Sequence, residues 1–128
     1  MESLYLAETS YTPEVNFNIE EKKFYLKGKS LPPDALDFYQ PILDWVEKFF
    51  NSAQVPIDMA LEFMLDYYNT ASSKQIAKLF LLIKDSLASN LVTIHWYYYE
   101  DDYDMLESGK QYQKLIGLNF KYIVLDDE

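Results

Sequence analysis

The 128-residue sequence contains no cysteine and only three glycines. The absence of cysteine excludes disulfide bonds, thiolate metal sites and a cysteine nucleophile. The chain also has neither a P-loop nor a G-x-G-x-x-G motif, so nucleotide binding by these routes has no support. No apolar run approaches the roughly 20 residues of a membrane-spanning helix, and the first residues lack the basic and apolar regions of a signal peptide. We therefore expect a cytoplasmic protein that does not insert into membranes.

Basic side chains are also scarce, with 11 lysines and arginines against 21 aspartates and glutamates, for a formal net charge of −10. A polyanion is repelled by nucleic-acid phosphates and by anionic lipid, so neither is an expected partner. The acidic surface has two interpretations. It keeps the protein soluble, as in many small proteins, or it forms a face for a basic partner.

Apolar and aromatic residues are abundant, at 49% and 17% of the chain. A chain of this length and composition buries a core of its own, so we expect one domain over residues 1–128. Residues 1–12 have no clear periodicity and are expected to form a loose N-terminal arm. Residues 126–128 are expected to form an acidic tail.

The spacing of apolar residues predicts strands and helices that alternate after an initial hairpin. Alternation of period two predicts strands at 15–19, 24–28, 57–66, 91–98 and 120–125. Helical spacing predicts helices at 36–50, 72–87 and 101–115, the first capped by Asp34. The order β-β-α-β-α-β-α-β favours an α/β fold with a mixed sheet of four to five strands. About three helices would pack mainly on one face of this sheet.

The segment that follows the strand at 57–66 is rich in hydroxyl groups. Ser72 and Gln75 have the S-x-x-Q spacing of a capping box, which predicts Ser72 as the helix N-cap and Thr70 as an exposed loop residue. Two interpretations follow. The hydroxyls are ordinary capping groups, or Thr70 accepts a phosphate beside the positive end of the helix dipole.

The same segment resembles the SiaC family of bacterial biofilm-regulation phosphoproteins. The matching run, residues 64–74, reads Met-Leu-Asp-Tyr-Tyr-Asn-Thr-Ala-Ser-Ser-Lys. Other family-like features follow the same order along nearly the whole chain: Thr12-Pro13, the strand Phe24-Tyr25-Leu26-Lys27-Gly28, the helix Pro41-Ile42-Leu43-Asp44-Trp45-Val46-Glu47, and His95-Trp96-Tyr97-Tyr98.

The resemblance implies a STAS-like fold and a regulatory role without catalytic activity, cofactor or metal. A serine/threonine kinase would phosphorylate Thr70 and a PP2C-type phosphatase would remove the phosphate. The unphosphorylated form would bind and activate a diguanylate cyclase in cyclic-di-GMP signalling. Because Ala71 stands where the family has a serine, Ser72 and Ser73 are alternative acceptors. The implied partner-binding surface comprises Asp66, Tyr67, Tyr68, Asn69, Ala71, Ser72 and Lys74.

Two other functions remain open at this point. An anti-sigma-factor antagonist would use the same phosphorylation switch on a different partner. A small metal-binding or hydrolytic domain would use other groups. The acidic cluster at residues 100–104 is a candidate site for Ca²⁺ or Mg²⁺. His95 and Lys74 are candidate bases for a hydrolase that uses the hydroxyl of Thr70 or Ser72.

Overall fold

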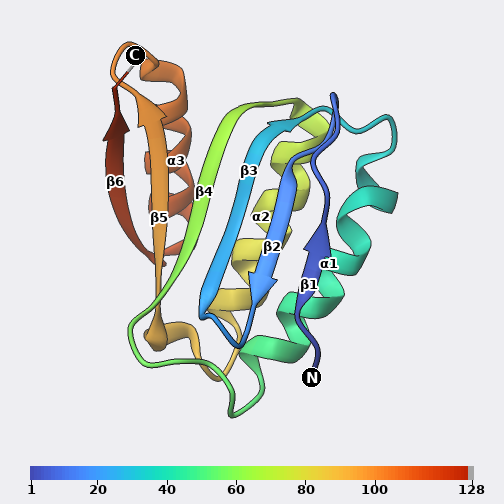
Figure 1. Cartoon of the computed structure of the whole chain (residues 1–128). Coiled ribbons are helices and arrows are strands. Elements are labelled where there is room, and N and C mark those ends of the chain that lie inside the picture. Colours follow the sequence, from blue (N-terminus) through green and yellow to red (C-terminus); the bar gives the residue numbers. More distant parts are fainter. Residues whose placement is uncertain (127–128) are drawn as a thin grey trace.

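The computed structural model describes residues 1–126 and contains one six-stranded sheet whose strands lie side by side in chain order (Figure 1). Asp127 and Glu128 of the expected acidic tail lie outside the described residues. The elements are β1 (Leu4–Leu6), β2 (Glu14–Asn18), β3 (Lys23–Ser30), α1 (Ala35–Phe50), β4 (Met59–Tyr68), α2 (Thr70–Lys84), the 3₁₀ turn η1 (Ser89–Leu91), β5 (Val92–Tyr99), α3 (Tyr103–Ile116) and β6 (Asn119–Leu125).

The sheet begins with three antiparallel strands. β2 and β3 form the predicted hairpin, and their alternate residues Phe17 and Phe24 face each other in the core. β1 pairs with β2, so the expected loose arm contains a strand and the sheet has six strands instead of four or five. Three residues are too few for a periodic signal. Pairing with β2 and a 2.8 Å hydrogen bond from Trp45 Nε1 to the carbonyl oxygen of Glu2 hold this segment in place.

From β3 onward the strands are parallel, and a helix connects each to the next. Such crossovers are nearly always right-handed. Three crossovers that advance toward the same edge therefore place their helices on the same face. Figure 1 shows α1, α2 and α3 together behind the sheet, as the sequence predicts. The core lies between this helical layer and the sheet.

The helices begin and end partly as predicted. Asp34 caps α1 by accepting a hydrogen bond from the backbone N–H of Asp37 at 3.1 Å, and Pro41 lies inside the helix. In α2 the stripe from Ile76 to Ile83 is buried as expected. The predicted end of this helix at residue 87 is wrong, since α2 ends at Lys84 and the Leu87 side chain is 84% exposed.

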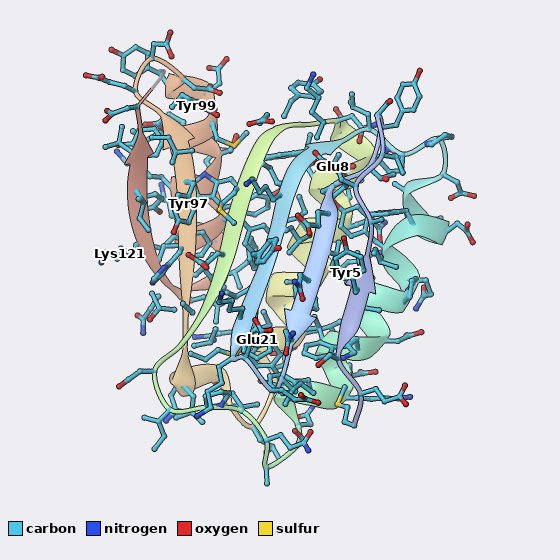
Figure 2. All side chains as sticks on the ribbon, in the orientation of Figure 1. Tyr5, Glu8, Glu21, Tyr97, Tyr99 and Lys121 are labelled. Atoms are coloured by element: carbon cyan, nitrogen blue, oxygen red, sulfur yellow. The ribbon has the colours of Figure 1, made fainter. Side chains whose placement is uncertain are left out.

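Among residues 1–126, no helix covers the opposite face of the sheet (Figure 2). It carries polar and aromatic side chains, among them Tyr5 and Tyr97, and the hydroxyl of Tyr97 donates a 2.5 Å hydrogen bond to Glu62. Alternate residues of each strand thus separate a polar face from the apolar core. Within residues 1–126, the helices are too short or too polar to cross a lipid bilayer.

Candidate functional site

The hydroxyl-rich segment lies at the carboxyl edge of the parallel strands. β3 and β4 end next to each other, where Ser30 pairs with Tyr68, and Thr70 is the first residue of α2. The backbone N–H of Asn69 donates to the carbonyl oxygen of Ser30 at 3.1 Å. The carboxyl ends of parallel strands are where α/β proteins commonly place their binding sites.

Asn69, not Ser72, is the N-cap of α2. Its backbone is extended (φ −83°, ψ 173°), and its side-chain oxygen accepts a 2.8 Å hydrogen bond from the N–H of Ser72. The prediction of a Ser72–Gln75 capping box is therefore wrong, because asparagine caps a helix as well as serine does. The helix begins two residues before the predicted N-cap, and Thr70 occupies its first turn instead of a loop.

Ser72 is fully buried. Its Oγ lies 2.8 Å from Ser30 Oγ and donates to the Ser30 carbonyl oxygen at 3.1 Å. Ser30 Oγ lies 2.6 Å from the hydroxyl of Tyr39 on α1, and burial raises the pKa of Tyr39 to about 12. Ser72 therefore forms part of an internal network and presents no exposed hydroxyl in this structure.

The other two candidate acceptors are more accessible. Thr70 is exposed, whereas Ser73 is half-buried. The Ser73 hydroxyl donates a 2.7 Å hydrogen bond to the carbonyl oxygen of Thr70. Of the three hydroxyls weighed from the sequence, that of Thr70 lies on the most exposed residue.

The residues of the expected partner surface gather around Thr70, with one exception. Asp66, Tyr67, Ala71 and Lys74 are exposed, and Tyr68 and Asn69 are half-buried. Ser72 faces the interior and contributes nothing to the exposed surface. The surface therefore consists of the end of β4 and the first turn of α2.

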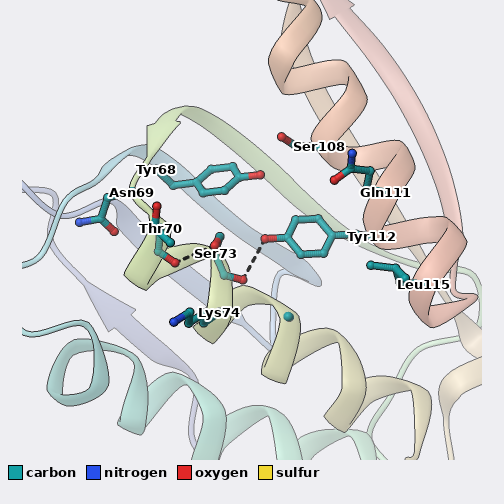
Figure 3. Close-up of a pocket in the computed structure, with 10 residues that line it drawn as sticks. Tyr68, Asn69, Thr70, Ser73, Lys74, Ser108, Gln111, Tyr112 and Leu115 are labelled. Atoms are coloured by element: carbon teal, nitrogen blue, oxygen red, sulfur yellow. Dashed lines mark hydrogen bonds between the residues drawn. The ribbon is translucent and has the colours of Figure 1, made fainter.

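A cleft of about 450 Å³ opens between this surface and α3 (Figure 3). The residues that line it are Tyr68, Asn69, Thr70, Ser73, Lys74, Ala77, Ser108, Gln111, Tyr112 and Leu115. The rings of Tyr68 and Tyr112 extend into the space between the two helices. Burial raises the pKa of both phenols further above the ordinary value of 10.0, which itself already keeps the two hydroxyls protonated at neutral pH.

Tyr112 links the two walls of the cleft. Its hydroxyl donates a 2.9 Å hydrogen bond to the carbonyl oxygen of Ser73, and its ring packs edge-on against Phe80 of α2. Sequence reasoning did not identify the α3 residues Ser108, Gln111 and Tyr112 as part of the site, because the tertiary fold brings them there and no local motif marks them.

A second, smaller hollow lies next to the cleft, and Tyr68 and Ser108 line both of them. The cleft and the hollow differ in charge. The hollow also contains Asp66, Asp102 and Asp104, whereas Lys74 is the single charged residue that lines the cleft. An anion attached near Thr70 is thus repelled from the hollow and attracted toward the cleft.

The structure does not bring the other candidate groups together. His95 pairs with Glu62 in the middle of the sheet, on the face opposite α2, so it lies away from Thr70 and Ser72. In the acidic segment, Asp102 caps α3 by accepting from the N–H of Met105 at 3.0 Å. Within residues 1–126, histidine and acidic side chains form no group of three that would hold a metal ion.

Comparison with known proteins gives one consistent result. A model of the SiaC family of regulatory phosphoproteins matches residues 6–125. An uncharacterized protein of Pseudomonas aeruginosa (strain UCBPP-PA14) is 23% identical over 115 residues, which cover 89% of this chain and 90% of that protein.

Two solved structures from P. aeruginosa have the same fold. The crystal structure of apo-SiaC has a TM-score of 0.82 at 23% identity and covers 96% of this chain and 99% of its own. A crystal structure of the diguanylate cyclase SiaD in complex with its activator SiaC gives a TM-score of 0.84 at 22% identity, over 95% of this chain and 99% of the matched chain.

Proposed function

Because the chain belongs to the SiaC family of regulatory phosphoproteins, its role is regulatory and not catalytic, and we propose that reversible phosphorylation of Thr70 controls its binding to a partner protein. The exposed position of Thr70 on the first turn of α2 carries this proposal. Ser72 lies in the interior, and Ser73 is partly covered and hydrogen-bonded.

The switch consists of two opposing reactions. A serine/threonine kinase transfers the γ-phosphoryl group of ATP to Thr70 Oγ1, which loses its proton as ADP leaves. A PP2C-type phosphatase uses water to break the new P–O bond, which releases inorganic phosphate and restores the hydroxyl. Both the kinase and a nucleotide-consuming partner need cytoplasmic nucleoside triphosphates, so we place the protein in the cytoplasm.

The physical effect is a change of charge on a surface that stays folded. A phosphate adds about −1.5 to −2 charges at neutral pH. The positive end of the α2 dipole lies beside Thr70 and stabilises such an anion. A partner that packs closely over Tyr67 and Ala71 would then have to accommodate a charge that the free hydroxyl of Thr70 does not carry. Phosphorylation therefore weakens binding without unfolding the protein.

A diguanylate cyclase is the proposed partner, activated by the unphosphorylated form. The support for this partner is the complex in which SiaC of P. aeruginosa is the activator of the cyclase SiaD. The output would then be cyclic-di-GMP signalling. An anti-sigma kinase is the alternative partner for the same phosphorylation switch. The STAS-like fold that the SiaC resemblance implies stays a prediction.

The test combines mass spectrometry with a binding assay. The protein is purified from its host, and its intact mass and peptides are measured before and after treatment with a PP2C-type phosphatase. Removable phosphate on the peptide that contains Thr70 is the expected result. Thr70→Ala should bind and activate the cyclase encoded in the same genome. Thr70→Asp should bind it at least tenfold less tightly, which corresponds to a loss of about 1.4 kcal/mol of binding free energy.

Ser73→Ala is the matched control, because it removes the neighbouring hydroxyl and leaves the acceptor in place. It should be phosphorylated and should bind as the unchanged protein does. If Thr70→Ala and Thr70→Asp both bound and activated the cyclase like the unchanged protein, Thr70 would not be the switch. Binding to an anti-sigma kinase and not to the cyclase would support the alternative partner.

A further inference from the structure

Helix α3 is the least buried of the three helices. It buries only Met105 and Gly109, whereas α2 buries six residues and α1 buries eight. An element with little buried surface opens at low free energy. The position and order of α3 should therefore respond readily to a change in the cleft that it shares with α2.

The cleft offers hydrogen-bond donors and one positive charge. Gln111 of α3 supplies an amide and Tyr68 a phenol, and Lys74 is the single charged residue of the lining. The Ser108 hydroxyl also lines the cleft; it donates to the carbonyl oxygen of Asp104 at 2.9 Å and would have to rotate to donate to an anion. Lys74 is exposed, and among residues 1–126 no salt bridge engages it. The Lys74 side chain also lines the hollow beside α1. Because it is flexible and its ammonium group is unpaired among the described residues, it can turn to an anion that enters the cleft from the side of α2.

Thr70 and Lys74 are four residues apart on α2. Residues with this spacing are neighbours on a helix surface, with about 5–6 Å between their Cβ atoms. Figure 3 shows Thr70 at one end of the cleft, on the same helix as Ser73 and Lys74, with Ser108 and Gln111 on the opposite wall. A phosphate on Thr70 thus reaches the cleft without any movement of the backbone of α2.

The acidic hollow on the far side of Tyr68 limits where that phosphate goes. Asp66, Asp102 and Asp104 line this hollow and repel a dianion, whereas Lys74 attracts it. The hollow carries negative charge and the cleft carries positive charge. Electrostatics therefore directs the phosphate into the cleft, which also has room for it.

We propose that the phosphate on Thr70 turns into the cleft between α2 and α3, where Lys74 and the polar side chains of Ser108 and Gln111 receive it. The modification then ties α3 to the first turn of α2, in addition to adding charge to the surface. This inference rests on the proposed function for the identity of the acceptor, but it concerns where the phosphate lies and what it orders.

A form with phosphothreonine incorporated at position 70 by an expanded genetic code tests the proposal without any kinase. The measured quantity is the second pKa of the phosphate, which is ordinarily about 6. It is obtained from the ³¹P NMR chemical shift as a function of pH. Lys74 favours the dianion, so Lys74→Gln should raise that pKa by about half a unit or more. Lys78→Gln is the matched control, since Lys78 lies one turn further along α2 and does not line the cleft, whereas Lys74 lines both the cleft and the hollow beside α1.

The second readout is amide hydrogen exchange in α3. The phosphorylated form should exchange more slowly than the unphosphorylated form across residues 105–112, and a Ser108→Ala, Gln111→Ala double variant should lose most of that difference. Equal phosphate pKa values in Lys74→Gln and Lys78→Gln, or unchanged exchange in α3, would overturn the proposal. Failure of the kinase to modify Thr70 would instead count against the proposed function, because the incorporated phosphothreonine needs no kinase.

Discussion

The Oγ atoms of Ser30 and Ser72 lie 2.8 Å apart in the interior, although 42 residues separate them in the chain. This contact joins the end of β3 to the first turn of α2, directly behind Thr70. The hydroxyl of Tyr39 on α1 completes the network at 2.6 Å from Ser30 Oγ. The candidate site thus rests on three elements that are fixed to one another by buried hydroxyl groups.

Ser72→Ala should lower the free energy of unfolding by about 1 kcal/mol, since it removes a buried hydroxyl that contacts both polar atoms of Ser30. Urea denaturation measures this change. Ser73→Ala is the control, because the Ser73 hydroxyl lies in a half-buried position and bonds only to the backbone of its own helix. Equal losses in the two variants would argue against a structural role for the Ser72 hydroxyl.

Asn69→Ala should destabilise the protein by about 0.5–2 kcal/mol, because the N–H of Ser72 loses its capping acceptor. Asn69→Asp should retain most of the stability, since a carboxylate also caps a helix and interacts favourably with its dipole. Thermal unfolding of the two variants beside the unchanged protein gives the comparison. A stable Asn69→Ala protein would show that α2 begins elsewhere in solution.

Gly109→Ala tests the contact between α3 and β5. An added Cβ would lie 2.6 Å from Cδ1 of Trp96, whose indole N–H donates to the carbonyl oxygen of Met105 at 2.8 Å. Overpacking destabilises the folded state by about 1–3 kcal/mol. The higher helix propensity of alanine offsets about 1 kcal/mol of this loss. We expect net destabilisation and an altered near-ultraviolet circular dichroism spectrum.

Lys110→Ala is the control for the glycine variant. Lys110 is exposed on the same helix, and its 4.0 Å ion pair with Glu107 contributes little at the surface. Its spectrum and its unfolding midpoint should stay close to those of the unchanged protein. A Gly109→Ala protein that behaves in the same way would mean that α3 packs more loosely on Trp96 than its position in the structure indicates.

The stability of the folded state should fall as the pH rises from 10 toward 12. The pKa values of Tyr39 and Tyr97 are raised from 10.0 to about 12, in both cases chiefly by burial. A raised pKa means that the folded state holds the proton more tightly than the unfolded state. The contribution is therefore complete below pH 10 and is lost as the pH approaches the folded-state pKa.

Phenolate absorbance and urea denaturation at several pH values measure this effect. Tyr97→Phe should make the decline in stability between pH 10 and 12 shallower, because it removes a phenol that donates to Glu62. Tyr11→Phe is the control, since Tyr11 is 62% exposed. Identical pH profiles for the two variants would contradict the assigned environment of Tyr97.

Local patterns predicted most of the fold correctly. The β2–β3 hairpin, β4 and the buried stripe of α2 follow from alternation or from helical spacing, which reflect which side of an element faces the core. The patterns failed where an element was too short to show a period, and where two neighbouring residues were both suited to the same role. β1 has only three residues, and both Asn69 and Ser72 are residues that cap helices.

The sequence by itself determined the α/β order and the family, because these depend on local spacing and on residue types in a fixed order. It also pointed to the hydroxyl-rich turn after β4 as the candidate site. Only the tertiary structure decided which hydroxyl is exposed. Ser72 is buried because Ser30 and Tyr39, which are distant in the chain, fold against it. The cleft beside Thr70 likewise exists only because the crossover from β5 to β6 places α3 against α2, an arrangement that no local pattern encodes.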